Sequence, residues 1–248
     1  MSLTTDQQPP PNPPWGAPWG VASSIAWTLA ALLLGVVAAT VSFGMWLGDA
    51  PRPSSFTNDG VVVAFGIFAS MPVQIALLVF AAQLRHWPPA IYLGLVVPRR
   101  AEVVVAVICI VALGVVFDVI LYVSGRDLVV PFQVDVWRTA SDAGWLVGLL
   151  IAIVVIAPIG EEIVFRGFLF RGLAKPGWEI HAVGGIALVW ALMHIQYDWL
   201  GMAQVFLVGL MLGWFRWASG STLLAIGMHI LINLESMIET WIKVEYFS

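Results

Sequence analysis

Charged residues are scarce in this chain of 248 residues, where they make up 10% of the sequence. Soluble domains carry roughly 25%, whereas 60% of this sequence is hydrophobic. A soluble fold of this length could not bury so much apolar surface, which excludes the ordinary soluble classes. The mean hydropathy of +0.92 therefore predicts a protein that lives in a lipid bilayer.

Cysteine and blocks of basic residues are also missing. The single cysteine, Cys109, lies inside an apolar run, which excludes an intrachain disulfide and a cysteine-based metal site. The net charge of −4, without a basic block, argues against a nucleic-acid partner. No lysine or arginine precedes the first apolar run, so we expect a retained first span rather than a cleavable signal peptide.

Long apolar runs are what the sequence has in abundance. A membrane-spanning helix needs about 20 apolar residues, and continuously apolar runs favour helices over the alternating strands of a barrel. The predicted fold class is an all-α, polytopic membrane protein, with a bundle of seven transmembrane helices and an intramembrane active site. An eighth helix is added if the short patch Ala90–Val97 embeds instead of lying at the interface. The predicted spans are Val21–Leu47, Gly60–Leu84, Glu102–Val123, Gly144–Arg171, Ile180–Ile195, Leu200–Trp217 and Thr222–Ile242.

The spans divide the chain into three predicted parts. Residues 1–20 are rich in proline and nearly uncharged, which is typical of a disordered segment. Residues 21–143 form the N-terminal transmembrane helices. Residues 144–248 contain the polar groups discussed below.

Lysine and arginine residues predict the orientation in the membrane. If the spans alternate, seven basic residues fall on one side and four on the other, and the richer side is expected in the cytoplasm. We predict a multi-pass protein of the plasma membrane. The richer side has Arg85, Arg99, Arg100, Arg166, Arg171, Lys175 and Arg216, and the other side has Arg52, Arg126, Arg138 and Lys243.

Two glutamates lie inside the fourth predicted span, within A157-P-I-G-E-E-I-V-F-R166. Ionisable residues at membrane depth are costly and therefore functional candidates, although a solvated pair at a helix end is the ordinary alternative. Pro158 is expected to kink the helix. Glu162 and Arg166 are four residues apart in the favourable order for an ion pair. Glu161 points about 100° away around the helix and is freer to act as a base.

Two histidines and an asparagine follow on later spans. His194 comes one turn after Trp190, and His229 and Asn233 share a helix face at i,i+4. The ordinary alternative for each is a packing hydrogen bond between helices. Counting residues from the intervening turns places Glu161, His194 and His229 at similar depth. The sequence therefore predicts that these groups converge in one layer of the bundle.

This set of groups suits hydrolysis by an activated water. Glu161 can take the proton of the water, and Asn233 can donate to an oxyanion. His194 and His229 can donate to the oxyanion or, together with Glu161, hold zinc with one position open for water. Serine-hydrolase G-x-S-x-G and zinc-protease H-E-x-x-H motifs are absent from the sequence, and one intramembrane aspartate, Asp118, cannot form an aspartyl dyad.

The motifs E161-E-x-x-x-R166, aromatic-x-x-x-H194 and H229-x-x-x-N233 resemble the signature of the CPBP intramembrane metalloproteases, the CAAX proteases and bacteriocin-processing enzymes, also called the abortive-infection family. The resemblance covers Gly144–Ile242 and implies a CPBP-like catalytic core in residues 144–248. It implies that Glu161 is the base and that Glu162 and Arg166 support it. His194, His229 and Asn233 would complete the site, with zinc or by a metal-free mechanism.

One position departs from the family pattern. The family usually has phenylalanine where this chain has Trp190, and we expect the change to be conservative for packing. The expected partners are membrane lipid and a peptide or protein substrate, lipidated as in CAAX-type processing or bacteriocin-like. Two alternatives stay open: a non-catalytic scaffold or immunity protein of the same fold, and a small proton-coupled transporter that uses the glutamates and histidines as a relay.

Access to the site is expected from the cytoplasmic side. The turns at Lys175 and Ser221 lie on the side predicted to be cytoplasmic, and Arg166 is expected to be near water at that end. Trp190, Phe165 and Phe168 are candidate apolar walls for a hydrophobic substrate segment, although ordinary core or lipid-facing roles are more common for such residues.

Overall fold

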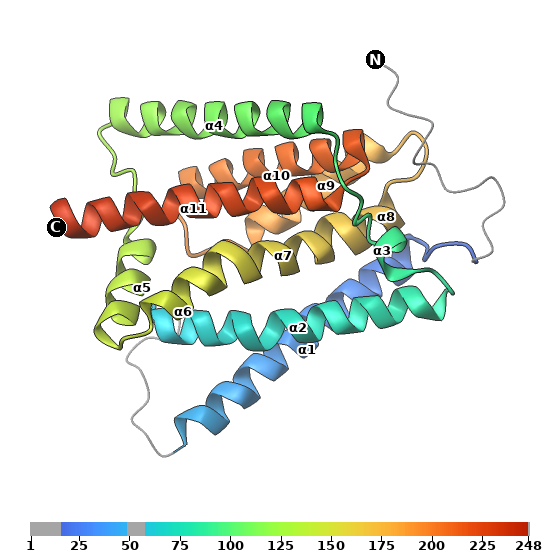
Figure 1. Cartoon of the computed structure of the whole chain (residues 1–248), viewed down its shortest axis with the longest axis horizontal. Helices are drawn as coiled ribbons and strands as arrows, with labels where there is room; N and C mark the ends of the chain where they lie inside the picture. Colours follow the sequence, from blue (N-terminus) through green and yellow to red (C-terminus); the bar gives the residue numbers. More distant parts are fainter. Residues whose placement is uncertain (1–15, 49–57, 248) are drawn as a thin grey trace.

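The computed structural model describes residues 16–48 and 58–247, and within these ranges every regular element is a helix (Figure 1). The all-α fold class is therefore confirmed. Residues 1–15 of the predicted N-terminal segment and Arg52 lie outside the described residues. The elements are α1 (Val21–Leu47), α2 (Gly60–Leu84), α3 (Pro89–Tyr92), α4 (Arg100–Val123), α5 (Pro131–Asp142), α6 (Leu146–Ile151), η2 (Ala152–Ile156), α7 (Ala157–Glu162), η3 (Ile163–Leu169), α8 (Phe170–Leu173), α9 (Glu179–Leu192), α10 (Trp199–Ser219) and α11 (Thr222–Tyr246).

Six of the seven predicted spans are long enough and apolar enough to cross a bilayer in the described part of the chain. The first two begin and end at the predicted residues, and α6 through α8 stack end to end as one 28-residue span, 146–173. The predicted fifth span is too short. Its helix, α9, has 14 residues, about 21 Å at 1.5 Å per residue, against a hydrocarbon core of about 30 Å.

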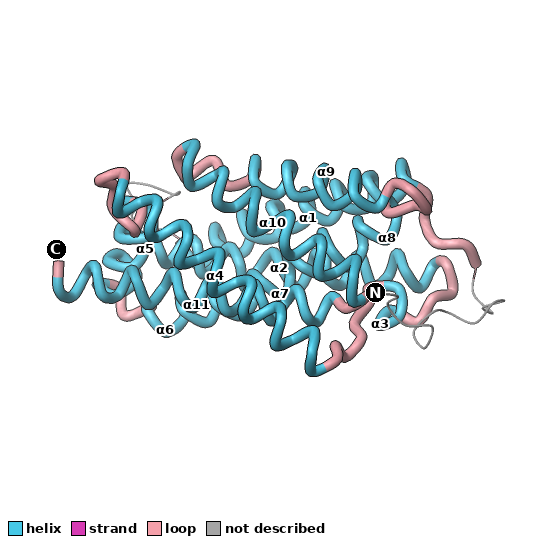
Figure 2. Tube along the Cα trace, turned by 90° about the horizontal axis from the view of Figure 1, so that it is seen from above, coloured by secondary structure: helices cyan, strands magenta, loops and turns pink. Residues whose placement is uncertain are grey.

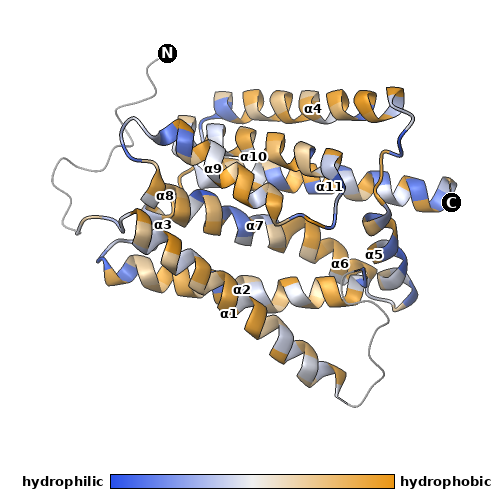
Figure 3. Ribbon diagram, turned by 180° about the vertical axis from the view of Figure 1, so that it is seen from behind, coloured by the Kyte–Doolittle hydropathy of each residue, from blue (hydrophilic) through white to orange (hydrophobic). Residues whose placement is uncertain are grey.

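The helices lie roughly along the long axis of the molecule and define two ends (Figures 1 and 2). One end, here called the Lys175 end, contains α3, the turn after α8 and the turn between α10 and α11. The opposite end, here called the Gln196 end, contains α5, the start of α6, the loop between α9 and α10, and the end of α11. Apolar residues cover much of the helix surfaces (Figure 3). On α1 and α4 they include exposed Val36 and Val104, as expected of lipid-facing helices.

The span that carries the two glutamates is not a regular α-helix. Two π-helical segments, η2 and η3, flank α7, and Pro158 is the second residue of α7. In the turn before the proline, the Ala157 amide donates to the Ala152 carbonyl five residues back. A π-helical turn of this kind is often found at functional sites. The irregularity expected from Pro158 thus takes the form of widened turns.

Residues 16–20 differ from the disorder predicted for them. The Trp19 indole donates to the Ala81 carbonyl at 2.9 Å, and the Gly16 carbonyl accepts from the Trp87 indole at 2.7 Å. Arg85 Nε donates to the Ala17 carbonyl at 2.9 Å. Tryptophan and arginine donors therefore hold this stretch against α2 and the segment after it, an interaction that composition alone could not predict.

The short patch Ala90–Val97 begins inside α3, a helix of four residues, and continues as irregular chain. It is pinned at the Lys175 end by the Thr222 hydroxyl, which donates to the Leu93 carbonyl at 2.6 Å, and by the Ser221 hydroxyl, which donates to the Val96 carbonyl. A helix of four residues cannot span a membrane, so the eighth span is absent from this part of the described chain.

Candidate active site

The bundle contains a cavity of about 250 Å³ whose wall is built by α2, α4, α5, η2, α7, α9, α10 and α11. Four of the predicted site residues line it: Glu161 from α7, His194 from just beyond α9, and His229 and Asn233 from α11. Trp190 of α9 lines it as well. The depth arithmetic predicted that these groups converge, and the structure brings the four residues to one cavity.

Glu162 and Arg166 lie behind this wall and form the predicted ion pair. Arg166 Nη1 lies 3.0 Å from Glu162 Oε1, and Arg166 Nη2 donates to the Gly209 carbonyl at 3.2 Å. Both side chains are fully buried, so the expectation that Arg166 reaches water is wrong. A buried arginine and glutamate keep their charges only as a pair with further hydrogen bonds, which fixes their geometry.

The same Glu162 oxygen also holds His229. His229 Nδ1 lies 3.0 Å from Glu162 Oε1, so the carboxylate accepts from the imidazole and from Arg166 together. Because Nδ1 is directed at the carboxylate, Nε2 is the ring nitrogen left for other partners, and the ring lines the cavity. Sequence spacing paired Glu162 with Arg166 but missed His229, because that contact joins residues 67 positions apart.

His194 is oriented by the backbone of its own helix. Its Nδ1 lies 2.8 Å from the Trp190 carbonyl, an atom that can only accept. Nδ1 therefore carries a hydrogen, and Nε2 is left for other partners. A loop residue beside it, Tyr197, also lines the cavity. Loss of water contact, helped by the negative charge of Glu161, raises the pKa of Tyr197 to about 12, so the phenol stays a neutral donor.

Trp190 has a contact with Glu161 that phenylalanine could not make. Its indole Nε1 donates to Glu161 Oε2 at 2.6 Å. The indole ring is 3% exposed, and the Arg166 guanidinium carbon stands 4.7 Å from its centroid. The expected packing role is confirmed, because Trp190 is buried in the hydrophobic core, and the indole N–H adds a contact that the packing argument did not foresee. The other two candidate wall residues, Phe165 and Phe168, are both buried in the hydrophobic core.

Asn233 uses one amide hydrogen within the bundle. Its Nδ2 donates to the Ile153 carbonyl of η2 at 2.8 Å. The second amide hydrogen and the amide oxygen remain for other partners, since the side chain offers two donors and one acceptor. Asn233, the predicted oxyanion donor, thus also links α11 to the span that contains the π-helical segments.

The donor set of Glu161, His194 and His229 suits zinc chemically, with both imidazoles oriented through Nδ1 as metal-bound histidines commonly are. Within residues 16–48 and 58–247, the ligand atoms of these three residues do not all lie within 4.8 Å of one another. Glu161 Oε2 is also engaged by Trp190. In the described structure, the three residues are therefore not assembled as a zinc centre.

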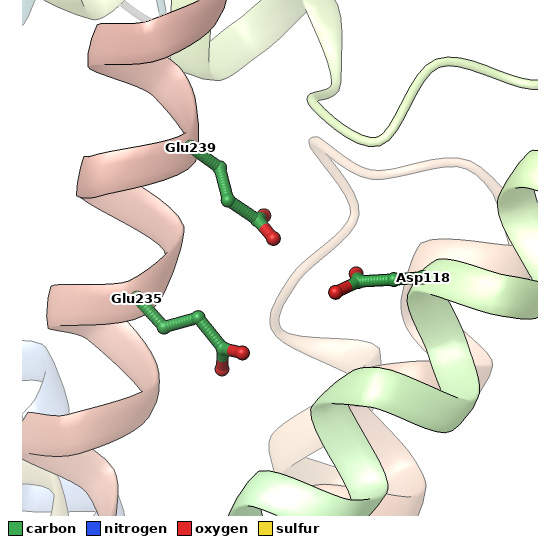
Figure 4. A group of neighbouring side chains, drawn as sticks. All are labelled: Asp118, Glu235 and Glu239. Atoms are coloured by element: carbon green, nitrogen blue, oxygen red, sulfur yellow. The ribbon is translucent and has the colours of Figure 1, made fainter.

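Three other carboxylates do come together within 4.8 Å: Asp118 of α4 with Glu235 and Glu239 of α11 (Figure 4). All three line the same cavity as Glu161. Sequence reasoning considered only Asp118, although the i,i+4 spacing of Glu235 and Glu239 already places both on one helix face. The cluster makes one wall of the cavity acidic.

The cavity extends toward the Gln196 end and not toward the turns at Lys175 and Ser221. Its wall includes Leu128 and Val130 from the α4–α5 loop and Gln196 and Tyr197 from the α9–α10 loop. Access through the Lys175 end, expected from the sequence, therefore does not fit the structure. A shallower pocket outside it shares Val130, Phe132 and Gln196 with this wall and contains the ion pair Arg126–Asp198.

The structure reduces the number of basic residues that can indicate the orientation in the membrane. Arg166 and Arg216 are buried, which leaves five of the seven basic residues at the Lys175 end as topology signals. The opposite end keeps Arg126, Arg138 and Lys243, with Arg52 outside the described residues. Among the described residues the bias is five against three, and this difference is small, because the positive-inside rule depends on exposed residues flanking the spans.

Comparison with known families agrees with the motifs. Residues 143–234 match the family model described as type II CAAX prenyl endopeptidase Rce1-like. Searches of curated proteins and of solved structures returned no significant match. The matched segment includes all six predicted site residues, as well as Trp190. The motif spacing and this match agree that residues 143–234 are similar to the CAAX proteases of the CPBP family.

Proposed function

We propose that this protein is an intramembrane endopeptidase that hydrolyses a peptide bond with water activated by Glu161. One observation carries the proposal: Glu161 of α7, His194 after α9, and His229 and Asn233 of α11 line a single cavity inside the bundle. The family match over residues 143–234 supports the reaction class. Burying this many polar groups around one cavity is costly in a membrane protein and is expected at functional sites.

The proposed reaction uses the two oxygens of Glu161 differently. Oε2 accepts from the Trp190 indole, and Oε1 is left to take a proton from a water in the cavity. The resulting hydroxide attacks the substrate carbonyl, and the same proton later passes to the leaving nitrogen. The products are a free carboxylate and a free amine.

His229 and Asn233 are proposed to stabilise the oxyanion formed in this attack. A proton on His229 Nε2 would be supported from behind by the Glu162 carboxylate at Nδ1. The second amide hydrogen of Asn233 would donate as well. His194 Nε2 is proposed to guide the water or the leaving group. Zinc held by Glu161, His194 and His229 is the alternative, and if bound it would act as a Lewis acid.

The proposed substrate is a hydrophobic or lipidated peptide segment of CAAX type. The cavity mixes apolar wall residues such as Ile67 and Val208 with polar ones, as a lipid-facing protease requires. We also propose a plasma-membrane location. If the Lys175 end faces the cytoplasm, the cavity opens toward the non-cytoplasmic face of the membrane. Access from the cytoplasm requires the reverse orientation, with the Gln196 end in the cytoplasm.

The test is cleavage of a fluorogenic reporter peptide by the full chain purified into lipid nanodiscs, with a farnesylated and an unprenylated version compared. Glu161→Ala is expected to lower kcat/KM by about a hundred- to ten-thousandfold, as loss of a general base does. Glu245→Ala removes an exposed glutamate near the C-terminus and serves as the matched control, with activity unchanged. Equal cleavage by wild type and Glu161→Ala would leave the scaffold alternative standing.

The transporter alternative predicts a different outcome. A proton relay strings its groups along a pore, whereas the rings of His194 and His229 both lie within 5.3 Å of the Trp190 ring centroid. Proton uptake into proteoliposomes that depends on Glu161, without peptide cleavage, would favour transport over proteolysis.

A further inference from the structure

We infer that Trp190 is a positioning residue for the reaction, because its indole N–H fixes the carboxylate of Glu161 so that only one oxygen is free to act as the base. The inference rests on the proposed function for its kinetic consequence. The contact itself, Nε1 to Oε2 at 2.6 Å, is a property of the fold that can be measured without any substrate.

The surroundings of Trp190 leave its indole little freedom. The Arg166 guanidinium carbon stands 4.7 Å from the ring centroid, and the imidazoles of His194 and His229 meet the ring at interplanar angles of 70° and 83°. The ring is 3% exposed. A side chain packed on three sides cannot turn away, so the direction of its N–H is set before any substrate arrives.

The backbone of the same residue orients a second site residue. The Trp190 carbonyl accepts from His194 Nδ1 at 2.8 Å, while the indole donates to Glu161. Trp190 therefore couples Glu161 on α7 to His194 at the end of α9.

A phenylalanine at this position would keep the ring and lose the donor. Trp190→Phe preserves a face for Arg166 and edges for the two imidazoles, so it isolates the N–H. The matched control is Trp19→Phe, which removes another indole N–H that donates to a protein oxygen, the Ala81 carbonyl at 2.9 Å, away from the cavity. The two variants make the same chemical change at two places.

The first measurement needs no activity. With ¹⁵N-labelled indole nitrogens, the 13 tryptophans of the chain give separate indole signals in an NMR spectrum of the nanodisc sample. The signal lost in Trp190→Phe is expected to move upfield in Glu161→Gln, because an amide oxygen is a weaker acceptor than a carboxylate. If no indole signal responds to Glu161→Gln, the contact is absent and the inference is overturned. Wild type and Glu161→Gln suffice for this comparison if Trp190→Phe does not fold.

The second measurement follows the rate of peptide cleavage against substrate concentration. Trp190→Phe is expected to lower kcat by about ten- to a hundredfold with KM nearly unchanged, because a misplaced base slows the reaction without weakening substrate binding. Trp19→Phe is expected to keep the wild-type kcat and KM.

The outcomes separate the two proposals. A folded Trp190→Phe with the wild-type kcat overturns the positioning role. Wild-type protein that cleaves no reporter peptide contradicts the proposed function, and the NMR comparison then decides whether Trp190 holds Glu161.

Discussion

Asn233 of α11 donates to the Ile153 carbonyl, and this carbonyl is the one that Pro158 leaves without a helical donor. In the π-helical turn, Ala157 donates to Ala152, so the next donor in register would be the nitrogen of residue 158. Proline has no N–H to give. An unsatisfied carbonyl in a bundle costs free energy, so a side chain from another helix takes the place of the missing donor.

This relationship predicts a measurable coupling between Asn233 and Pro158. Asn233→Leu is expected to lower the free energy of unfolding in mixed micelles by about 1–2 kcal/mol. In a Pro158→Ala background the backbone gains an N–H at residue 158, so Asn233→Leu should cost less. A double-mutant cycle measures the difference. Strictly additive effects would mean that the amide does not replace the proline N–H.

Substitutions of the two adjacent glutamates are expected to have different effects on cleavage and on stability. Glu161→Gln should abolish cleavage with little change in stability, since its side chain faces the cavity. Glu162→Gln removes the charge that Arg166 and His229 share, and breaking a buried pair from one side costs about 3–5 kcal/mol. Thermal unfolding and cleavage assays on both variants provide the measurement. Exchanged phenotypes would contradict the assignment of base and support.

Removal of metal is expected to leave activity within about twofold of the untreated enzyme, because Glu161, His194 and His229 are not assembled within ligand distance of one another in the described chain. The protein is dialysed against a zinc chelator, its metal content is measured by mass spectrometry, and cleavage is then assayed. Loss of activity that zinc restores would instead favour the zinc mechanism.

Labelling should place the two ends of the bundle on opposite faces of the membrane. In a Cys109→Ala background, Gln196→Cys at the cavity end and Pro176→Cys at the Lys175 end both introduce exposed thiols. We expect an impermeant reagent to label one from outside intact cells and the other from inside-out vesicles. The face that labels Gln196→Cys is the face to which the cavity opens. Labelling of both from one face would contradict the arrangement of the spans.

The sequence by itself determined the membrane fold and the choice of most candidate site residues. Continuous apolar runs located the spans, because burial in lipid depends on local composition and length. The i,i+4 spacing of Glu162 and Arg166 predicted their ion pair, because residues four apart on a helix are neighbours. Residue counts from the turns predicted one layer for Glu161 and the histidines.

Only the tertiary structure decided how those residues are connected. The bonds from His229 to Glu162, from Trp190 to Glu161 and from Asn233 to Ile153 join different helices. The side of the bundle toward which the cavity extends also depends on how the helices pack. Spacing along one helix carries no information on the rotation of its neighbours, so these contacts and the direction of access required the assembled bundle.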